Sequence, residues 1–328
     1  MGWPHVRGAV LLAATVALMS ACSVSEPGQP QSASSPSTAV TSTAPTTTSS
    51  PPGSAPRSSV PATGAVPGDC TATGCPALTA PQAEFMSGRI TEANAAARVP
   101  GYLSAVLDDL DEAWTPWFGE LGWGDPAPGR VLIEGDERFQ SRCTEADGSS
   151  PAVTSDTPNA FFCPLDTASD GSGHSVTGSV ILPVEAFVGI WTGVFLTEGP
   201  LDSISGFQGE FTAATVVAHE YGHVVVDRIM QAGGLTAEPV GENSELIADC
   251  LAGNWAATVL QRDELSITDI VQAVALLGKI GDPAPGQGHG TATQRIKAIS
   301  LGFFGPSVSS GRGQPVNCLS RYWPEVFR

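Results

Sequence analysis

Residues 23 to about 68 set the first limit on how this chain folds, because they consist mainly of Ser, Thr, Pro and Ala. Their only charged residues are Glu26 and Arg57. Such a segment cannot bury enough apolar surface to offset the entropy lost on ordering, so the sequence predicts a disordered tether over residues 22–68. A folded domain is therefore expected in residues 69–328, which is long enough for a sizeable core.

The charge balance narrows the class of protein. The chain has 33 acidic and 15 basic residues and a formal net charge of −18. Nucleic-acid binding is excluded, because neutralising phosphates takes clustered Lys and Arg. No apolar run reaches the roughly 18 residues typical of a membrane-spanning helix. We therefore expect no nucleic-acid partner, and membrane contact only at the N-terminus.

The N-terminus has the pattern of an export signal. Arg7 precedes an apolar run over residues 9–19 that is too short to cross a bilayer comfortably, so residues 1–21 are predicted to be a signal peptide. Cys22 follows Ser-Ala at the end of this run, which resembles the bacterial lipobox. The resemblance implies that Cys22 is lipidated and anchors the exported protein to the outer face of the bacterial cell membrane. Ordinary cleavage, giving a free secreted protein, is the alternative.

Cysteine usage fits an exported chain. Besides Cys22 there are six cysteines, an even number in a compartment where disulfides persist. Six cysteines allow fifteen pairings, and short separations favour two of the bridges. The third would clamp the C-terminal segment onto a central helix. The three bridges are Cys70 with Cys75, Cys143 with Cys163, and Cys250 with Cys318. Free buried thiols are the alternative.

Hydrophobic periodicity predicts more helix than strand. Helical patterns cover residues 82–98, 103–115, 212–231, 244–260, 266–279 and 290–303. Runs of β-branched or aromatic residues between Gly, Pro and Ser predict strands at 130–134, 160–163 and 176–182. Helices therefore dominate the second half of the chain.

Two of the five histidines lie four residues apart in an apolar run, as His219 and His223. Four residues rotate an α-helix by about 400°, so both rings emerge on one face and can bind one cation. Glu220 points about 100° away from His219, where it would take a proton from water rather than bind the cation. A zinc site with two His and one carboxylate leaves a position for that water. The alternative is two core histidines paired through hydrogen bonds.

A third ligand is available downstream. Glu245 and Asp249 are again four apart, on one face of a predicted helix with apolar neighbours, where an unpaired charge would be costly. We expect Glu245 to bind the metal and Asp249 to fix the tautomer of a ligating histidine. Alternatively, Glu245 only favours its helix N-terminus, with Ser244 as the cap. That alternative leaves Asp249 in mid-helix without a reason.

Three more residues are candidates for roles around the metal. Either His289 or Tyr221 would stabilise negative charge on a carbonyl oxygen under attack. Arg295, one to two turns into a predicted helix, would instead orient a carboxylate of the site. For His289 the alternative is a loop residue bonded to local backbone. His174 lies among Gly and Ser and is predicted on a surface loop.

Four stretches within about residues 143 to 318 match a known family in order. They are Phe161-Phe162-Cys163-Pro164-Leu165-Asp166; Gly209-Glu210-Phe211 with Val217-Ala218-His219-Glu220-Tyr221-Gly222-His223; Glu245-Leu246 with Ala248-Asp249-Cys250-Leu251-Ala252-Gly253; and His289-Gly290-Thr291 with Gln294-Arg295. This ordered set resembles the bacterial neutral zinc metallopeptidase family, which has gluzincin-type motifs.

The resemblance implies an α+β fold, a mainly helical zincin-like core with a small β-sheet beside the motif helix. It implies that His219, His223 and Glu245 bind Zn²⁺ and that Glu220 is the base. It also supports a bridge between Cys143 and Cys163.

In zincins generally, an edge strand upstream of the motif helix pairs with an extended peptide. Residues 176–182 are our candidate for that strand, with Pro183 ending the pairing. The sequence departs from the family at Val224, where many relatives have another His. It also departs in a Gly/Ser-rich insertion over about 166–177 and before about residue 130, where we find no match.

The predicted function is hydrolysis of peptide bonds in a peptide or protein substrate, with Glu220 as general base. One alternative is a tethered lipoprotein with a structural zinc and no catalysis, which would need a fourth protein ligand. Another is a zinc amidase that cleaves a cell-wall peptide with the same residues. The substrate and the oligomeric state do not follow from the sequence.

Overall fold

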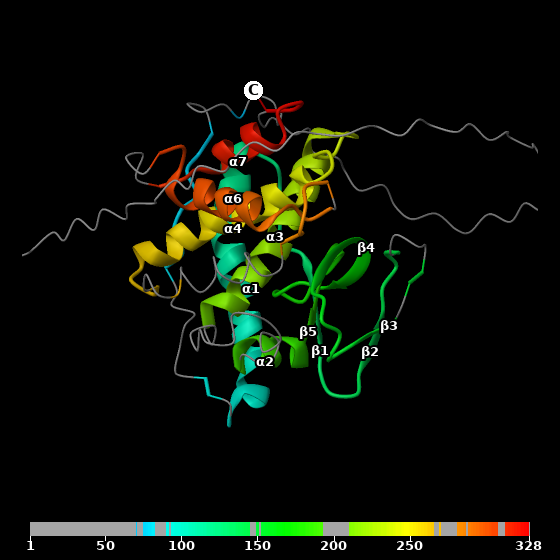
Figure 1. Ribbon diagram of the computed structural model, residues 1–328. Helices are drawn as coiled ribbons and strands as arrows, with labels where there is room; N and C mark the ends of the chain where they lie inside the picture. The colour runs from blue at the N-terminus through cyan, green and yellow to red at the C-terminus, as the bar shows by residue number, and fades with distance from the viewer. Residues whose placement is uncertain are drawn as a thin grey trace, which may run out of the picture. The chain divides into compact units, whose positions relative to one another are not determined.

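The computed structural model describes Cys70 and residues 75–82, 90–91, 93–144, 149–150, 152–192, 210–265, 269, 281–286, 288–307 and 312–327. All of these belong to the second of two compact units, residues 59–328. The predicted signal peptide, Cys22, the tether and nearly all of the predicted helix 266–279 lie outside the described residues. In the described part, helices predominate beside two small sheets, which confirms the α+β expectation (Figure 1).

The larger sheet has three strands in the order β1-β5-β4. Strand β1 (Gly129–Ile133) pairs in parallel with β5 (Ser175–Pro183), and β4 (Phe161–Ser169) pairs antiparallel with the other side of β5. Two further strands, β2 (Arg138–Gln140) and β3 (Ala152–Thr154), form a short antiparallel ribbon that periodicity did not predict.

The expectation that residues 176–182 form the edge strand is wrong. They lie in β5, which has a partner strand on each side, and residues 178–183 are buried. A continuous apolar run is typical of a strand covered on both sides, whereas alternation marks a more exposed one. Strand β4 lies at an edge of the three-stranded sheet instead.

The Gly/Ser-rich insertion forms the far end of the β4–β5 hairpin. Residues 167–169 pair with residues 175–177, so the insertion lengthens both strands. In the turn, Asp170 Oδ1 accepts hydrogen bonds from the N–H groups of Ser172 and His174, both at 2.8 Å. The His174 side chain is exposed, as predicted for a surface loop.

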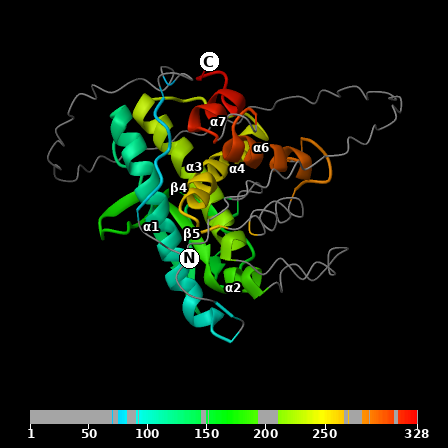
Figure 2. The same ribbon diagram turned by 90° about the vertical axis from the view of Figure 1, so that its left-hand side faces the viewer.

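A single helix, α1 (Ala95–Leu121), covers the helix predicted over 103–115 and the end of the one predicted over 82–98, of which residues 83–89 and 92 lie outside the described part. Pro100 and Gly101 lie inside this helix, which continues through them because one stripe of apolar residues stays buried along its length. Helix α2 (Val184–Thr192), which was not predicted, follows β5 directly. Figure 2 shows α1 running lengthwise beside the central helices.

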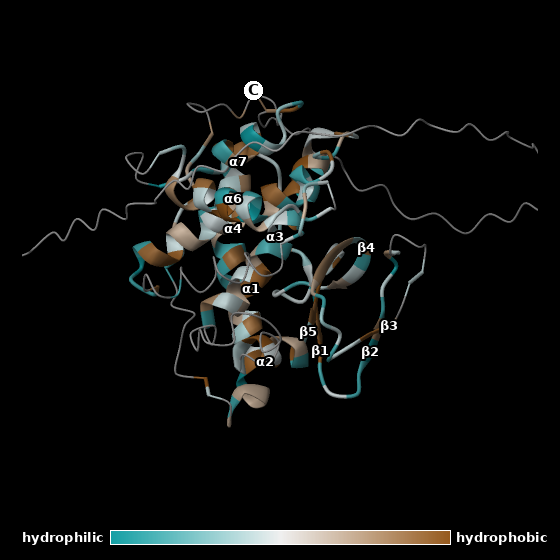
Figure 3. Ribbon diagram, viewed as in Figure 1, coloured by the Kyte–Doolittle hydropathy of each residue, from teal (hydrophilic) through white to brown (hydrophobic). Residues whose placement is uncertain are grey.

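Helices α3 (Glu210–Gly233), α4 (Asn243–Gln261) and α6 (Ala292–Phe304) confirm the helices predicted over 212–231, 244–260 and 290–303. Helix α7 (Pro315–Tyr322) was not predicted. Brown hydrophobic and teal hydrophilic stretches alternate along the helices, as expected of helices that bury one face (Figure 3). Among the described residues, no helix combines the length and apolarity needed to cross a bilayer.

The three expected disulfide bridges are present. Cys70 pairs with Cys75 and Cys143 with Cys163, while Cys250 of α4 pairs with Cys318 of α7. The last bridge joins residues 68 positions apart and fastens the C-terminal segment to α4, as the sequence predicted. Cys163 lies in β4, so the second bridge anchors the edge strand to the segment around Cys143.

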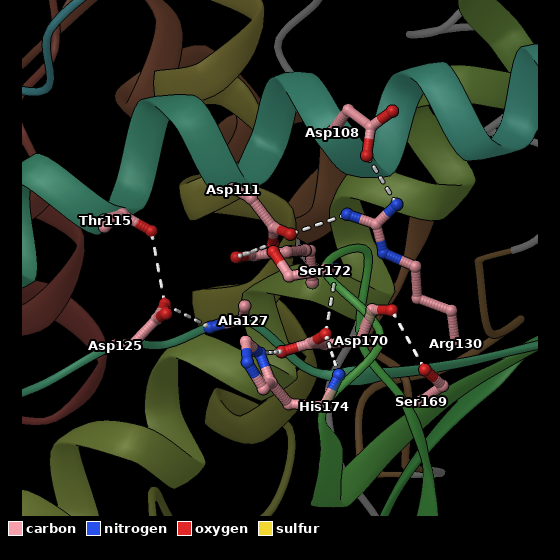
Figure 4. Close-up of polar contacts among 11 residues, drawn as sticks. Asp108, Asp111, Thr115, Asp125, Ala127, Arg130, Ser169, Asp170, Ser172 and His174 are labelled. Carbon is pink, nitrogen blue, oxygen red and sulfur yellow. Dashed lines mark hydrogen bonds and ion pairs between the residues drawn. The ribbon is translucent and has the colours of Figure 1, made fainter.

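An arginine of the sheet is bound to α1. Arg130 of β1 donates to Asp108 and Asp111, both at 2.6 Å (Figure 4). A Cβ added at Gly171, in the β4–β5 turn, would lie 2.6 Å from the Arg130 guanidinium, so the turn packs closely over this group. The network therefore fastens both β1 and the hairpin to α1.

Candidate metal centre

Helices α3 and α4 bring three ligand-type side chains to one point. His219 Nε2 lies 3.2 Å from Glu245 Oε2, and His223 Nε2 lies 3.6 Å from Glu245 Oε1. One ligand atom from each residue lies within 4.8 Å of the other two. Two imidazole nitrogens and one carboxylate oxygen are a donor set that suits zinc. The group therefore fits a metal whose remaining position stays open.

A glycine allows the two helices to approach this closely. A Cβ built at Gly222, between the two histidines, would lie 2.7 Å from Ala248 Cα and 2.8 Å from its carbonyl oxygen. Ala248 lies between Glu245 and Asp249 on α4. The two helices therefore make a close backbone contact at the level of the ligand group, and only glycine fits there without movement.

The buried ion pair of Asp249 and Arg295 orients the ring of His219. Its Nδ1 lies 2.8 Å from Asp249 Oδ1, so the ring donates there and turns Nε2 toward Glu245. Arg295 of α6 donates to both oxygens of Asp249, at 2.8 Å each. Asp249 and Arg295 thus take the positions expected for them, although nothing in sequence spacing predicted their mutual contact.

Glu220 is held by the edge strand. Its side chain is 8% exposed, and its Oε2 accepts a hydrogen bond of 3.1 Å from the backbone N–H of Phe162 in β4. Nothing in the sequence indicates this partner, because a backbone donor leaves no signal in residue type. The bond fixes one carboxylate oxygen and joins the motif helix to the sheet.

Without metal, burial and mutual charge separate the pKa values of the histidines. Burial disfavours protonation of His219, but the charge of Asp249 and the hydrogen bond to it raise its pKa to about 10. For His223, burial and then the charge of His219 lower the pKa to about 4. His223 is therefore neutral and ready to bind, whereas His219 has to lose a proton when a cation binds.

The two glutamates differ in the same way. Burial raises the pKa of Glu245, but its hydrogen bond and charge interaction with His219 outweigh burial and lower the pKa to about 2. For Glu220, burial is the largest cause and raises the pKa to about 7, against the charge of His219. Glu245 is thus anionic, as a ligand requires, while Glu220 is suited to exchanging a proton near neutral pH.

A cavity of about 610 Å³ opens over these groups. Its walls come from α3, from β4 through Phe161, Phe162 and Pro164, and from α2 through Phe187 and Ile190. No residue of β5 lines it, in agreement with the position of β5 inside the sheet. The volume lies in the range of small-molecule and peptide sites.

His289 stands at the edge of the cavity on a loop held by Asp282. The Asp282 carboxylate accepts the backbone N–H groups of His289 and Gly290, at 2.7 and 3.0 Å. The His289 side chain is 64% exposed and lines the cavity. Its ring Nδ1 lies 3.6 Å from Asp282 Oδ1. The backbone contacts agree with the loop alternative, and the role on the carbonyl oxygen stays a prediction. Asp282 was not predicted to have a role.

The structure contradicts a catalytic role for Tyr221. Its side chain is fully buried, does not line the cavity, and donates a 2.7 Å hydrogen bond to Asp111 of α1. On a helix, Tyr221 points about 200° away from His219, so it faces α1 when the histidines face the cavity. Val224, where many relatives have a histidine, is also fully buried outside the cavity lining.

Comparison with models of protein families relates this chain to known proteins. The model described as "Putative neutral zinc metallopeptidase" matches residues 69–311. The chain belongs to this family. The match begins well before residue 130, where motif comparison found no counterpart, so α1 is part of the family's domain. Membership implies zinc and peptide hydrolysis at the level of the family.

Two relatives show how far the similarity extends. The uncharacterized protein YpfJ of Escherichia coli K12 is 29% identical over 238 residues, covering 66% of this chain and 69% of YpfJ. The uncharacterized protein Rv2575 of Mycobacterium tuberculosis H37Rv is 36% identical over 121 residues, covering 29% of this chain and 41% of Rv2575. No solved structure gives a significant match.

Proposed function

We propose that the protein is a zinc-dependent peptidase in which Glu220 is the general base. The observation that carries the proposal is the meeting of His219, His223 and Glu245 beside the buried Glu220 at the floor of a cavity. Zinc bound by the three ligands would supply a Lewis acid for the scissile carbonyl and acidify a water molecule.

The protein's own groups account for the proton transfers. Glu220 Oε2 is held by the Phe162 N–H, so Oε1 is the oxygen that takes a proton from the attacking water and returns it to the leaving amine. The exposed ring of His289 would donate to the carbonyl oxygen as it becomes negative. Asp249 and Arg295 keep the His219 ring in one orientation throughout.

Strand β4 offers an edge to an extended peptide. Phe162 uses its N–H to bind Glu220, and Pro164 has no N–H. Neither residue can therefore donate a backbone hydrogen bond to a substrate. The carbonyl groups of the two residues would then accept hydrogen bonds from substrate N–H groups. A peptide or protein substrate would therefore bind as an added strand in which β4 mainly accepts hydrogen bonds.

The donor set also argues against a purely structural zinc. Structural sites usually have four protein ligands. Among the described residues, the His219, His223 and Glu245 group has no fourth His, Cys, Asp or Glu, and six cysteines form disulfides. An open position favours catalysis.

Metal removal tests the proposal. The full chain is expected to contain about one zinc per molecule by elemental analysis and to cleave members of a random peptide library. Chelation should abolish cleavage, and added zinc should restore it. Without the metal, the scissile carbonyl is not polarised and the attacking water is not acidified. Hydrolysis that persists in metal-free protein would refute the proposal. Purified peptidoglycan serves as a parallel substrate, since a cell-wall amidase would use the same residues.

We also propose that residues 1–21 are removed, that Cys22 carries lipid, and that residues 22–68 tether the domain 69–328 to the outer face of the cell membrane. The apolar run and the Ser-Ala-Cys sequence support this arrangement. In a bacterial host that processes lipoproteins, the wild-type chain should label with radioactive palmitate and sediment with membranes. Cys22→Ala should lose both properties, and equal labelling of the two would contradict lipidation at Cys22.

A further inference from the structure

The cavity extends to both sides of the metal ligands along α3. Its lining on this helix runs from Thr215, before His219, to Met230, beyond His223. At 1.5 Å per residue this stretch of helix is about 22 Å long. The cavity therefore has room for substrate groups on either side of the bond to be cleaved.

The two ends of the cavity differ in chemistry. Figures 1 and 2 show α2 beside the first half of α3. The end formed there, which we name the apolar subsite, is lined by Phe162, Ala186, Phe187, Ile190, Thr215 and Val216. The lining near the end of α3 includes the carboxylates of Asp227 and Glu238.

The apolar subsite offers no hydrogen-bonding side chain to a ligand. Thr215 is the only polar residue among these six, and its hydroxyl donates to the Phe211 carbonyl one turn earlier, at 2.8 Å. Asn159, just before β4, is a further polar residue of the cavity lining. A charged substrate side chain would lose its water there without gaining a partner. A large apolar side chain would instead gain about 25 cal/mol for each Å² removed from water.

The apolar subsite also lies next to the proposed reaction centre. Val216 is one turn before His219 on the same face of α3. Phe162 contributes both to the subsite and to the hydrogen bond with Glu220. The substrate residue bound here is therefore adjacent to the bond under attack.

We infer that the apolar subsite binds a large apolar side chain, such as Leu or Phe, of a substrate residue that flanks the scissile bond. The inference rests on the proposed peptidase function and specifies its substrate class. Ala186, Ile190 and Val216 are then the residues that determine specificity, because they form the wall without contacting the reacting atoms.

A binding experiment tests the inference apart from catalysis. The zinc-loaded full chain with Glu220→Gln is titrated with fluorescent hexapeptides of Gly and Ala that carry one Leu, Phe, Asp or Lys at each position in turn. Leu and Phe peptides are expected to bind about 10-fold or more tightly than Asp and Lys peptides at one position. The zinc-loaded wild type should cleave the same peptides next to that position.

Variants at the two ends of the cavity provide the control. Val216→Asp should lose the preference for Leu and Phe and gain binding of Lys, while Met230→Asp, at the other end, should keep the apolar preference. Ile190→Ser, at a half-buried position, should weaken Leu and Phe binding without affecting the fold. Zinc content and thermal melting are measured for each variant.

The outcomes separate the inference from the proposed function. Equal binding of Leu and Asp peptides, or cleavage without residue preference, overturns the apolar subsite and leaves the peptidase proposal standing. A Leu preference in binding, together with a wild type that cleaves nothing, supports the subsite and contradicts the peptidase proposal. Loss of the preference in Met230→Asp as well as in Val216→Asp would overturn the assignment to the α2 end.

Discussion

Glu220→Gln is expected to lower the kcat of peptide hydrolysis by about 10²- to 10⁴-fold while zinc content and folding stay unchanged. Glutamine keeps a side-chain oxygen that can accept the hydrogen bond from the Phe162 N–H, which is 3.1 Å long in the wild type. The buried N–H group therefore keeps its partner. Glutamine cannot take a proton from water. The variant therefore removes the proposed chemistry and preserves the contacts around it.

The measurement is steady-state hydrolysis of the best library peptide, with zinc determined on the same samples. Glu120→Gln on α1, an exposed residue outside the cavity, removes the same charge and should leave kcat unchanged. If Glu220→Gln with full zinc cleaves at the wild-type rate, Glu220 is not the base. If it loses its zinc, the residue supports the metal site instead.

Gly222→Ala should disrupt the metal centre through the contact of two helices. The added Cβ would lie 2.7 Å from the backbone of Ala248, so α3 and α4 must separate. Overpacking of this kind costs about 1–3 kcal/mol, and in a large domain each kcal/mol lowers the Tm by about 2–4 °C. The separation moves Glu245 away from the two histidines. If zinc binding has to overcome about 1.4 kcal/mol of this strain, the zinc affinity falls tenfold.

Two readouts check this prediction, the Tm of the metal-free protein and zinc affinity in competition with a chromophoric chelator. Gly119→Ala is the matched control, because Gly119 lies in α1 with nothing within 4 Å of an added Cβ. That change should raise stability by about 0.5–1 kcal/mol and leave zinc affinity unchanged. Wild-type zinc affinity in Gly222→Ala would show that the close contact does not set the ligand geometry.

Several features of the site could be predicted from local spacing. His219 and His223, and likewise Glu245 and Asp249, are four residues apart on long helices that periodicity identified, so each pair shares a face whatever surrounds it. The meeting of the two pairs was an inference from chemistry, since an isolated carboxylate in an apolar helix needs a partner. The structure brings the pairs together within hydrogen-bonding distance.

Other features depended on contacts between distant segments. Tyr221 neighbours the motif residues in sequence, yet its hydroxyl binds Asp111 of α1, 110 positions away. Phe162 holds Glu220 from 58 positions away through a backbone atom. The family resemblance gave no position for either contact, and helix α2, which forms one wall of the cavity, carried no recognised motif.

The sequence by itself determined the helix that carries the two histidines and the faces of α3 and α4, and it favoured the bridges Cys70–Cys75 and Cys143–Cys163, because these follow from helical period and short separations. Only the tertiary structure decided that β4 rather than β5 lies at the sheet edge and that Tyr221 faces away from the cavity. Strand order and the partner of a buried hydroxyl depend on which distant surfaces pack together. No local pattern encodes that choice.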